Sequence, residues 1–117
     1  MAKSLVHQVI ARARQLIDAE GSWVQAYAAV SADGTPVEPF DERAVRFCAS
    51  GALLRAAFEL TNSITAAREL HQAACRKLLP HALCAVHTIE DLNDTSIGRG
   101  TILQLLDEYL KPWVFTP

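Results

Sequence analysis

A single run of apolar residues dominates the hydrophobic pattern of this chain. At helical spacing, residues 41–60 are apolar on nearly every side, and Arg43, Arg46 and Ser50 fill the one narrow polar wedge. A helix that is apolar almost all round lies in the core of its domain. The pattern therefore predicts a buried central helix over about 41–60, with Asp41 as its N-cap.

Small residues are concentrated in this predicted helix, at Ala44, Cys48, Gly51 and Ala52. Small side chains let the backbone of a neighbouring element approach closely. A glycine inside a helix costs about 1 kcal/mol relative to alanine. We therefore interpret Gly51 as a site of tight packing rather than as the end of the helix.

Three further helices are predicted from apolar residues that recur every three or four positions. The first is capped by Ser4 and runs to about Ala19, and another follows Ser63 and runs to Leu79. The last opens with a capping-box pattern at Thr101, and we expect Pro112 to stop it.

Two segments between these helices have weaker patterns. Asp33-Gly34 separates the short stretches 24–30 and 35–38, which together predict a small β-hairpin at about 24–38. Residues 80–92 are consistent with either a short helix or two turns. The fold class expected from the whole pattern is mainly α, a compact bundle of four to five helices around the central one.

Composition narrows the class of protein. The length of 117 residues suits a single domain over 1–117, and the net charge of −2 comes from 11 basic and 13 acidic residues spread along the chain, which disfavours nucleic-acid binding. Three cysteines without a CxxC pair favour a reducing compartment. No apolar run is long enough for a membrane span and the start lacks a signal-peptide pattern. We expect a cytoplasmic protein without a cofactor.

His71 lies in the middle of an apolar helix face, one turn before Cys75. A buried histidine must be hydrogen-bonded and neutral or tuned for function, because burying an unpaired cation is unfavourable. A core histidine whose ring nitrogens are hydrogen-bonded explains the pattern. If His71 instead faces Cys48 or Cys75, a thiolate–imidazole pair becomes available for nucleophilic catalysis.

A second group of candidate ligands follows Pro80. If this segment is helical, His87 and Asp91 lie one turn apart and Cys84 lies in the same polar sector, and such side chains can bind zinc. Residues three apart differ in direction around a helix, so these side chains do not readily converge on one ion. A solvated helix face explains the same pattern.

Two other sets of residues are candidates for ligand binding. Asn93 and Asp94 belong to a turn-rich connector, for which side-chain hydrogen bonds to the backbone are a sufficient role. Alternatively, Asp94 and Arg99 face a cleft near the last helix and hold an anionic ligand. Arg55 and Glu59 are expected to form an ion pair, and Arg55 becomes an anion-binding candidate if that pair lines a pocket.

The end of the chain, residues 112–117, is unusually apolar for a terminal tail. It either folds back over the core or packs on a partner or a second copy of the chain, as in a homodimer. Trp113 and Phe115 are the candidate interface residues.

The chain contains Trp23, the pattern Asp41-x2-Ala44-x3-Cys48-x2-Gly51-Ala52, Asn93-Asp94 and Arg99. Together these residues resemble an uncharacterised family of small bacterial and phage proteins. The resemblance covers about Leu5 to Leu110, and Phe47 stands where tryptophan is expected in that family. Because the family has no established activity, the resemblance implies a fold rather than a function and directs attention to Cys48, Asn93, Asp94 and Arg99.

Two hypotheses about function follow from these patterns. The first, which the sequence favours, is a helical interaction domain that binds a protein partner or itself. The alternative is a small-molecule-binding protein or a hydrolase or transferase, built around His71 with Cys48 or Cys75.

Overall fold

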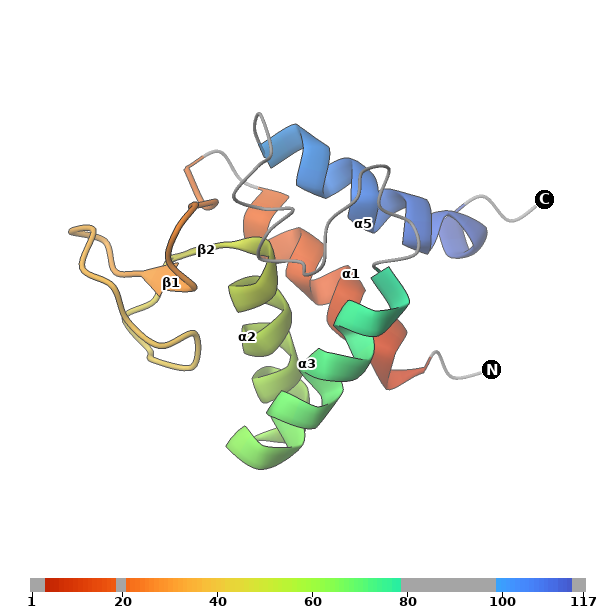
Figure 1. The fold of residues 1–117 in the computed structure, drawn as a ribbon, viewed down its shortest axis with the longest axis horizontal. Coiled ribbons are helices and arrows are strands. Elements are labelled where there is room, and N and C mark those ends of the chain that lie inside the picture. The colour runs from red at the N-terminus through yellow and green to blue at the C-terminus, as the bar shows by residue number, and fades with distance from the viewer. Residues whose placement is uncertain (1–3, 19–20, 79–98, 115–117) are drawn as a thin grey trace.

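The computed structural model describes residues 4–18, 21–78 and 99–114. Its four described helices and one small hairpin form a compact, mainly α fold (Figure 1), as the sequence predicts. In chain order the elements are α1 (Leu5–Asp18), β1 (Ala29–Val30), β2 (Arg46–Phe47), α2 (Ala49–Thr61), α3 (Ile64–Leu78) and α5 (Arg99–Val114). None of the described helices is long and apolar enough to cross a membrane.

Helix α1 packs against α2, α3 and α5, so its apolar stripe forms one wall of the core. Val9, Ile10, Ala13 and Ile17 are completely buried. The predicted N-cap is confirmed, because the Ser4 hydroxyl accepts a hydrogen bond from the backbone N–H of His7 at 3.1 Å. The first helix therefore forms where the spacing of its apolar residues places it.

The predicted start of the central helix is wrong. Helix α2 begins at Ala49, and the segment before it is extended at β2. There the N–H of Phe47 donates to Ser22 O at 2.9 Å, and the N–H of Cys48 donates to Ala28 O at 3.1 Å. These bonds satisfy backbone groups that a helix would have paired internally, and they bury Phe47 to 3% exposure.

Cys48, rather than Asp41, caps α2. The Cys48 thiol accepts a hydrogen bond from the backbone N–H of Gly51 at 3.2 Å. The Asp41 carboxylate instead accepts from the backbone N–H of Arg43 at 2.8 Å, which closes a local turn. The apolar pattern therefore predicts the burial of Ala44, Phe47 and Cys48 correctly, whereas Val45 is exposed and the predicted cap is wrong.

A short hairpin is confirmed, and its partner strand lies further along the chain than expected. Strand β1 pairs antiparallel with β2, with Ala29 opposite Phe47 and Val30 opposite Arg46. Val30 also forms a bridge with Pro36, so the chain does reverse at the predicted Asp33-Gly34 turn. Figure 1 shows the hairpin at the end of the bundle from which α2 starts.

Helix α5 is longer than predicted at both ends. It begins at Arg99 and continues through Pro112 to Val114. Proline removes one backbone donor, and in the last turn of a helix only a single hydrogen bond is lost. Pro112 therefore does not stop the helix, and Trp113 is part of α5 rather than of a separate tail.

Gly51 occupies the closest backbone contact between α2 and the hairpin. A Cβ atom at this position would lie 1.8 Å from Ala28 O and 2.7 Å from Ala28 C. No rotamer change can relieve a clash with main-chain atoms. The interpretation of Gly51 as a tight-packing site is confirmed.

Gly51→Ala is expected to lower the free energy of unfolding by about 1–3 kcal/mol, because overpacking against the backbone outweighs the gain in helix propensity. Urea denaturation followed by circular dichroism measures the effect. Gly100→Ala is the matched control, since a Cβ there meets nothing within 4 Å and alanine stabilises a helix by up to about 1 kcal/mol. Equal effects of the two substitutions would contradict the packing argument.

Two carboxylates with lowered pKa values predict a loss of stability in acid. Hydrogen bonds from Ser31 and Thr35 lower the pKa of Asp33 to about 2, and hydrogen bonds from Arg43 lower the pKa of Asp41 to about 2. Both groups stabilise the fold above their unfolded pKa near 4, and this contribution disappears as the pH falls to about 2. The double variant Asp33→Asn, Asp41→Asn should show a flatter pH dependence of its urea midpoint in this range. Parallel profiles would refute this assignment.

Candidate functional site

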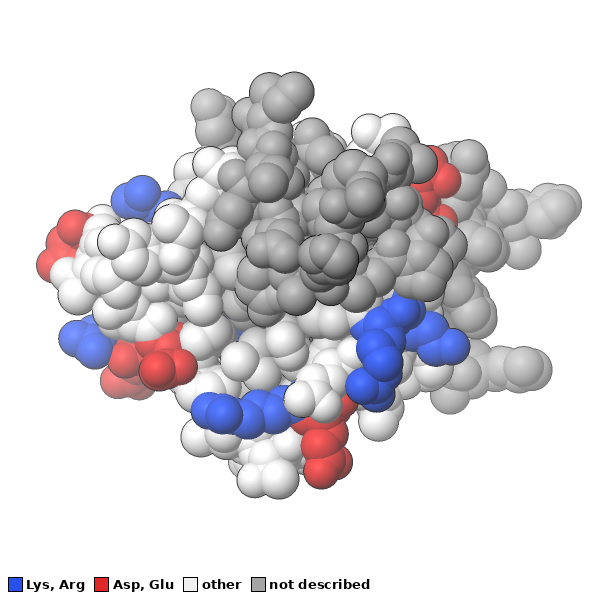
Figure 2. Space-filling model, in the orientation of Figure 1, with Lys and Arg blue, Asp and Glu red and all other residues white. Residues whose placement is uncertain are grey.

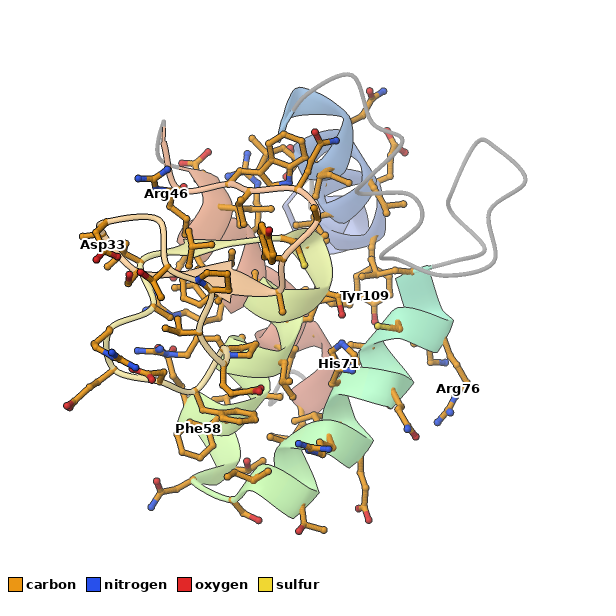
Figure 3. All side chains as sticks on the ribbon, turned by 60° about the vertical axis from the view of Figure 1, so that its left-hand side comes forward. Asp33, Arg46, Phe58, His71, Arg76 and Tyr109 are labelled. Carbon is orange, nitrogen blue, oxygen red and sulfur yellow. The ribbon has the colours of Figure 1, made fainter. Side chains whose placement is uncertain are left out.

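The most chemically informative contact in the described residues is between His71 and Ser50. His71 Nε2 lies 2.7 Å from Ser50 Oγ and 3.6 Å from Cys75 Sγ. Ser50 is only 7% exposed, whereas His71 and Cys75 are half-buried. Figure 3 shows the His71 side chain on the inner side of α3.

The helices place these three side chains by simple geometry. His71 and Cys75 are four residues apart on α3, which puts them on the same face one turn apart. Ser50 is the second residue of α2, directly after the Cys48 cap and the β2 strand. Because α2 and α3 pack against each other, the first turn of α2 meets the middle of α3.

The contact joins a potential nucleophile to a potential base. When the imidazole carries its proton on Nδ1, the Ser50 hydroxyl donates to Nε2, which is the arrangement of an activated serine. The opposite tautomer makes the ring the donor and the hydroxyl the acceptor. Ser50 also lies in the first turn of α2, where the helix dipole favours negative charge.

Of the two candidate cysteines, Cys75 has a described hydrogen-bond contact with His71, and a catalytic role of this pair stays a prediction. Cys48 is 5% exposed, and its thiol accepts from the Gly51 N–H, so the structure gives it a capping role. The described contacts therefore place Cys75 beside the imidazole.

Sequence reasoning missed Ser50, because the predicted helix placed it in the solvent-facing wedge with Arg43 and Arg46. Two signals point to it in retrospect. Ser50 is the one hydroxyl residue between positions 41 and 60. A histidine on an apolar face needs a hydrogen-bond partner, and a hydroxyl from the neighbouring buried helix can supply it.

A buried histidine, His7, lies between α1 and α5. His7 is 2% exposed, and its ring centroid lies 6.4 Å from that of Tyr109 on α5. The two rings are tilted by 37°, which is an ordinary packing arrangement of aromatic groups. We assign His7 to the packing of these two helices.

Arg55 and Glu59 form the predicted ion pair, with 3.3 Å between Arg55 Nε and Glu59 Oε2. Arg12 joins it, with Nε 2.8 Å from Glu59 Oε1. Burial raises the pKa of Glu59, but the hydrogen bonds and charges of Arg12 and Arg55 outweigh it, so its pKa lies below the ordinary value. The three residues connect α1 to the outer face of α2.

Arg55 also holds the loop before β2. Its Nη1 donates to Pro39 O and to Asp41 O, both at 3.0 Å, and its guanidinium lies 5.8 Å from the centroid of the Phe47 ring. These contacts explain Arg55 as a structural residue. Its predicted role in ligand binding stays a prediction.

Charged groups of the described residues are interspersed on the face shown in Figure 2, where Lys and Arg lie near Asp and Glu. Arg14 illustrates the pattern, since it pairs with Asp18 at 3.1 Å and with Asp107 on α5. Such mixed surfaces are typical of ordinary solvated faces.

Several predicted site residues have no described side chain. Their roles stay predictions. The predicted turn or helix at 80–92 lies outside the described residues, and so do these candidates: Asn93, Asp94, the metal ligands Cys84, His87 and Asp91, and Phe115. For Arg99 and Trp113, only the backbone is described, within α5. Over residues 4–18, 21–78 and 99–114, no group of three or more His, Cys, Asp or Glu could hold a metal ion.

The fold and site define a small, mainly helical domain with a serine–histidine contact between its α2 and α3 helices. A family model described as a family of unknown function, DUF6197, matches residues 1–109. The chain therefore belongs to this family. No curated protein and no solved structure matches the chain.

Proposed function

We propose that this protein is a hydrolase or acyltransferase in which Ser50 is the nucleophile and His71 the general base. The observation that carries the proposal is the distance of 2.7 Å between Ser50 Oγ and His71 Nε2. A nucleophile and a base within hydrogen-bond reach are the minimum requirement for covalent acyl transfer.

The reaction begins when Ser50 Oγ attacks the carbonyl carbon of an ester and His71 Nε2 takes the hydroxyl proton. The tetrahedral intermediate collapses, the bond to the leaving alcohol breaks, and Nε2 returns the proton to that alcohol. Water, deprotonated by His71, then attacks the acyl carbon and releases Ser50 and the acid. A second alcohol in place of water makes the reaction a transfer.

The surroundings of Ser50 support this role. Ser50 lies in the first turn of α2, where the positive end of the helix dipole favours the negative charge that the proposed reaction develops. The burial of Ser50, at 7% exposure, lowers the local dielectric and strengthens the hydrogen bond to His71. A purely structural hydrogen bond has the same geometry, and a reactivity experiment separates the two roles.

Wild-type protein is expected to hydrolyse p-nitrophenyl acetate and to be labelled at Ser50 by a fluorophosphonate probe, located by peptide mass spectrometry. Ser50→Ala should abolish the labelling, and His71→Gln should slow hydrolysis by about 10²–10⁴-fold. Cys75→Ala is the control, because it leaves the serine–histidine contact intact. Absence of labelling at Ser50 in folded wild-type protein, or unchanged rates in a folded Ser50→Ala variant, would contradict the proposal.

Self-association is a second candidate function, and the observation that favours it is the extension of α5 to Val114. Because this helix continues through Pro112 to Val114, it carries Trp113 on an ordered element. A side chain on a helix loses less conformational entropy on binding than one on a loose tail. Trp113 and Phe115 are the proposed contact residues.

Truncation after Lys111 should convert an oligomer to a monomer if this second candidate is right. Size-exclusion chromatography with light scattering gives the mass of each form in solution. Thermal unfolding of the truncated chain shows whether its fold is retained. A wild-type monomer, or an oligomer that survives truncation, would count against self-association through this segment.

A further inference from the structure

Helix α3 has a closed side and an open side around His71. At about 100° per residue, three completely buried residues lie within about 60° of His71 on one side: Ala67, Ala74 and Leu78. Within about 60° on the other side, Cys75 is half-buried and Arg68 is exposed. The half-buried imidazole therefore lies at the edge where α3 leaves the core, and its open side is that of Arg68.

Arg68 brings a positive charge to this open side. It precedes His71 by three residues on α3, so the two Cβ atoms are about 5–6 Å apart. Arg12, Arg14 and Arg55 on the other helices are each paired with a carboxylate. Arg68 forms no hydrogen bond or ion pair within the part of the chain that the structure describes, so its guanidinium is available to an anion from solution.

The chemistry of a guanidinium selects the group that it binds. Its N–H donors form two parallel hydrogen bonds with the two oxygens of a carboxylate. An ester attacked by Ser50 has its carbonyl beside the imidazole, because Ser50 Oγ lies 2.7 Å from His71 Nε2. A carboxylate elsewhere in the same molecule meets Arg68 if the substrate extends along the open side of α3.

We propose that Arg68 gives the Ser50–His71 pair a preference for substrates that carry a carboxylate. This inference rests on the proposed function and names the class of substrate. Arg68 is a binding residue in this account, and it makes no contact with the reacting atoms. A solvent-exposed ion pair contributes up to about fivefold in binding. The same contact is present before and during the reaction, so its loss raises KM and leaves kcat nearly constant.

Two matched esters test the preference, 4-acetoxybenzoate and its uncharged methyl ester. The measured quantity is the ratio of their kcat/KM values, after subtraction of the rate that remains in Ser50→Ala. Arg68→Gln should lower this ratio about threefold to fivefold, mainly through KM for the charged ester. A salt concentration of about 1 M should lower the ratio of the wild-type protein and leave that of Arg68→Gln nearly constant.

Arg76→Gln is the matched control, because it removes the same charge from α3. Arg76 is also exposed, and Figure 3 shows its side chain on the opposite side of this helix from His71. This variant should keep the wild-type ratio, and circular dichroism establishes that each variant is folded.

The outcomes separate the two proposals. If the wild-type protein hydrolyses both esters through Ser50 but Arg68→Gln keeps the wild-type ratio, the preference is refuted and the proposed function stands. An equal fall of the ratio in Arg68→Gln and Arg76→Gln would also refute it, since net charge would then explain the effect. If neither ester is hydrolysed through Ser50, the proposed function is wrong and the preference falls with it.

Discussion

The close contact between Gly51 and the backbone of Ala28 fixes the start of α2, and the rest of the site depends on it. No side chain fits at position 51, since a Cβ would lie 1.8 Å from Ala28 O. The same carbonyl accepts from the Cys48 N–H, and the Cys48 thiol caps the helix. These interactions set where the first turn of α2 meets α3, and hence where Ser50 lies relative to His71.

Helical periodicity was sufficient to predict the elements whose apolar residues form one stripe. In α1, Val9, Ile10, Ala13 and Ile17 repeat at helical spacing and are all fully buried. For the segment before α2, the predicted helix is wrong because its apolar residues fit the spacing of a helix as well as that of an extended segment. Its extended form depends on hydrogen bonds from Phe47 and Cys48 to residues far away in the chain, and a local pattern contains no information about such pairing.

The candidate site was predictable in part for the same reason. The placement of His71 one turn before Cys75 depends only on spacing within α3, and it is observed. The contact with Ser50 depends on how two helices dock, and an error in the start of α2 had assigned this serine to solvent. Predicting it required treating the histidine on an apolar helix face as a group in need of a hydrogen-bond partner, and searching the neighbouring helix for a hydroxyl.

The tautomer of His71 tests the proposed chemistry most directly, because only an unprotonated Nε2 can accept the Ser50 proton. Long-range ¹H–¹⁵N NMR correlation of ¹⁵N-histidine-labelled protein measures the protonation of each ring nitrogen. We predict a proton on Nδ1 of His71 and an accepting Nε2 whose resonance shifts in Ser50→Ala. A proton on Nε2 in the neutral ring, with Ser50 as the acceptor, would contradict the account and leave the contact as a structural hydrogen bond.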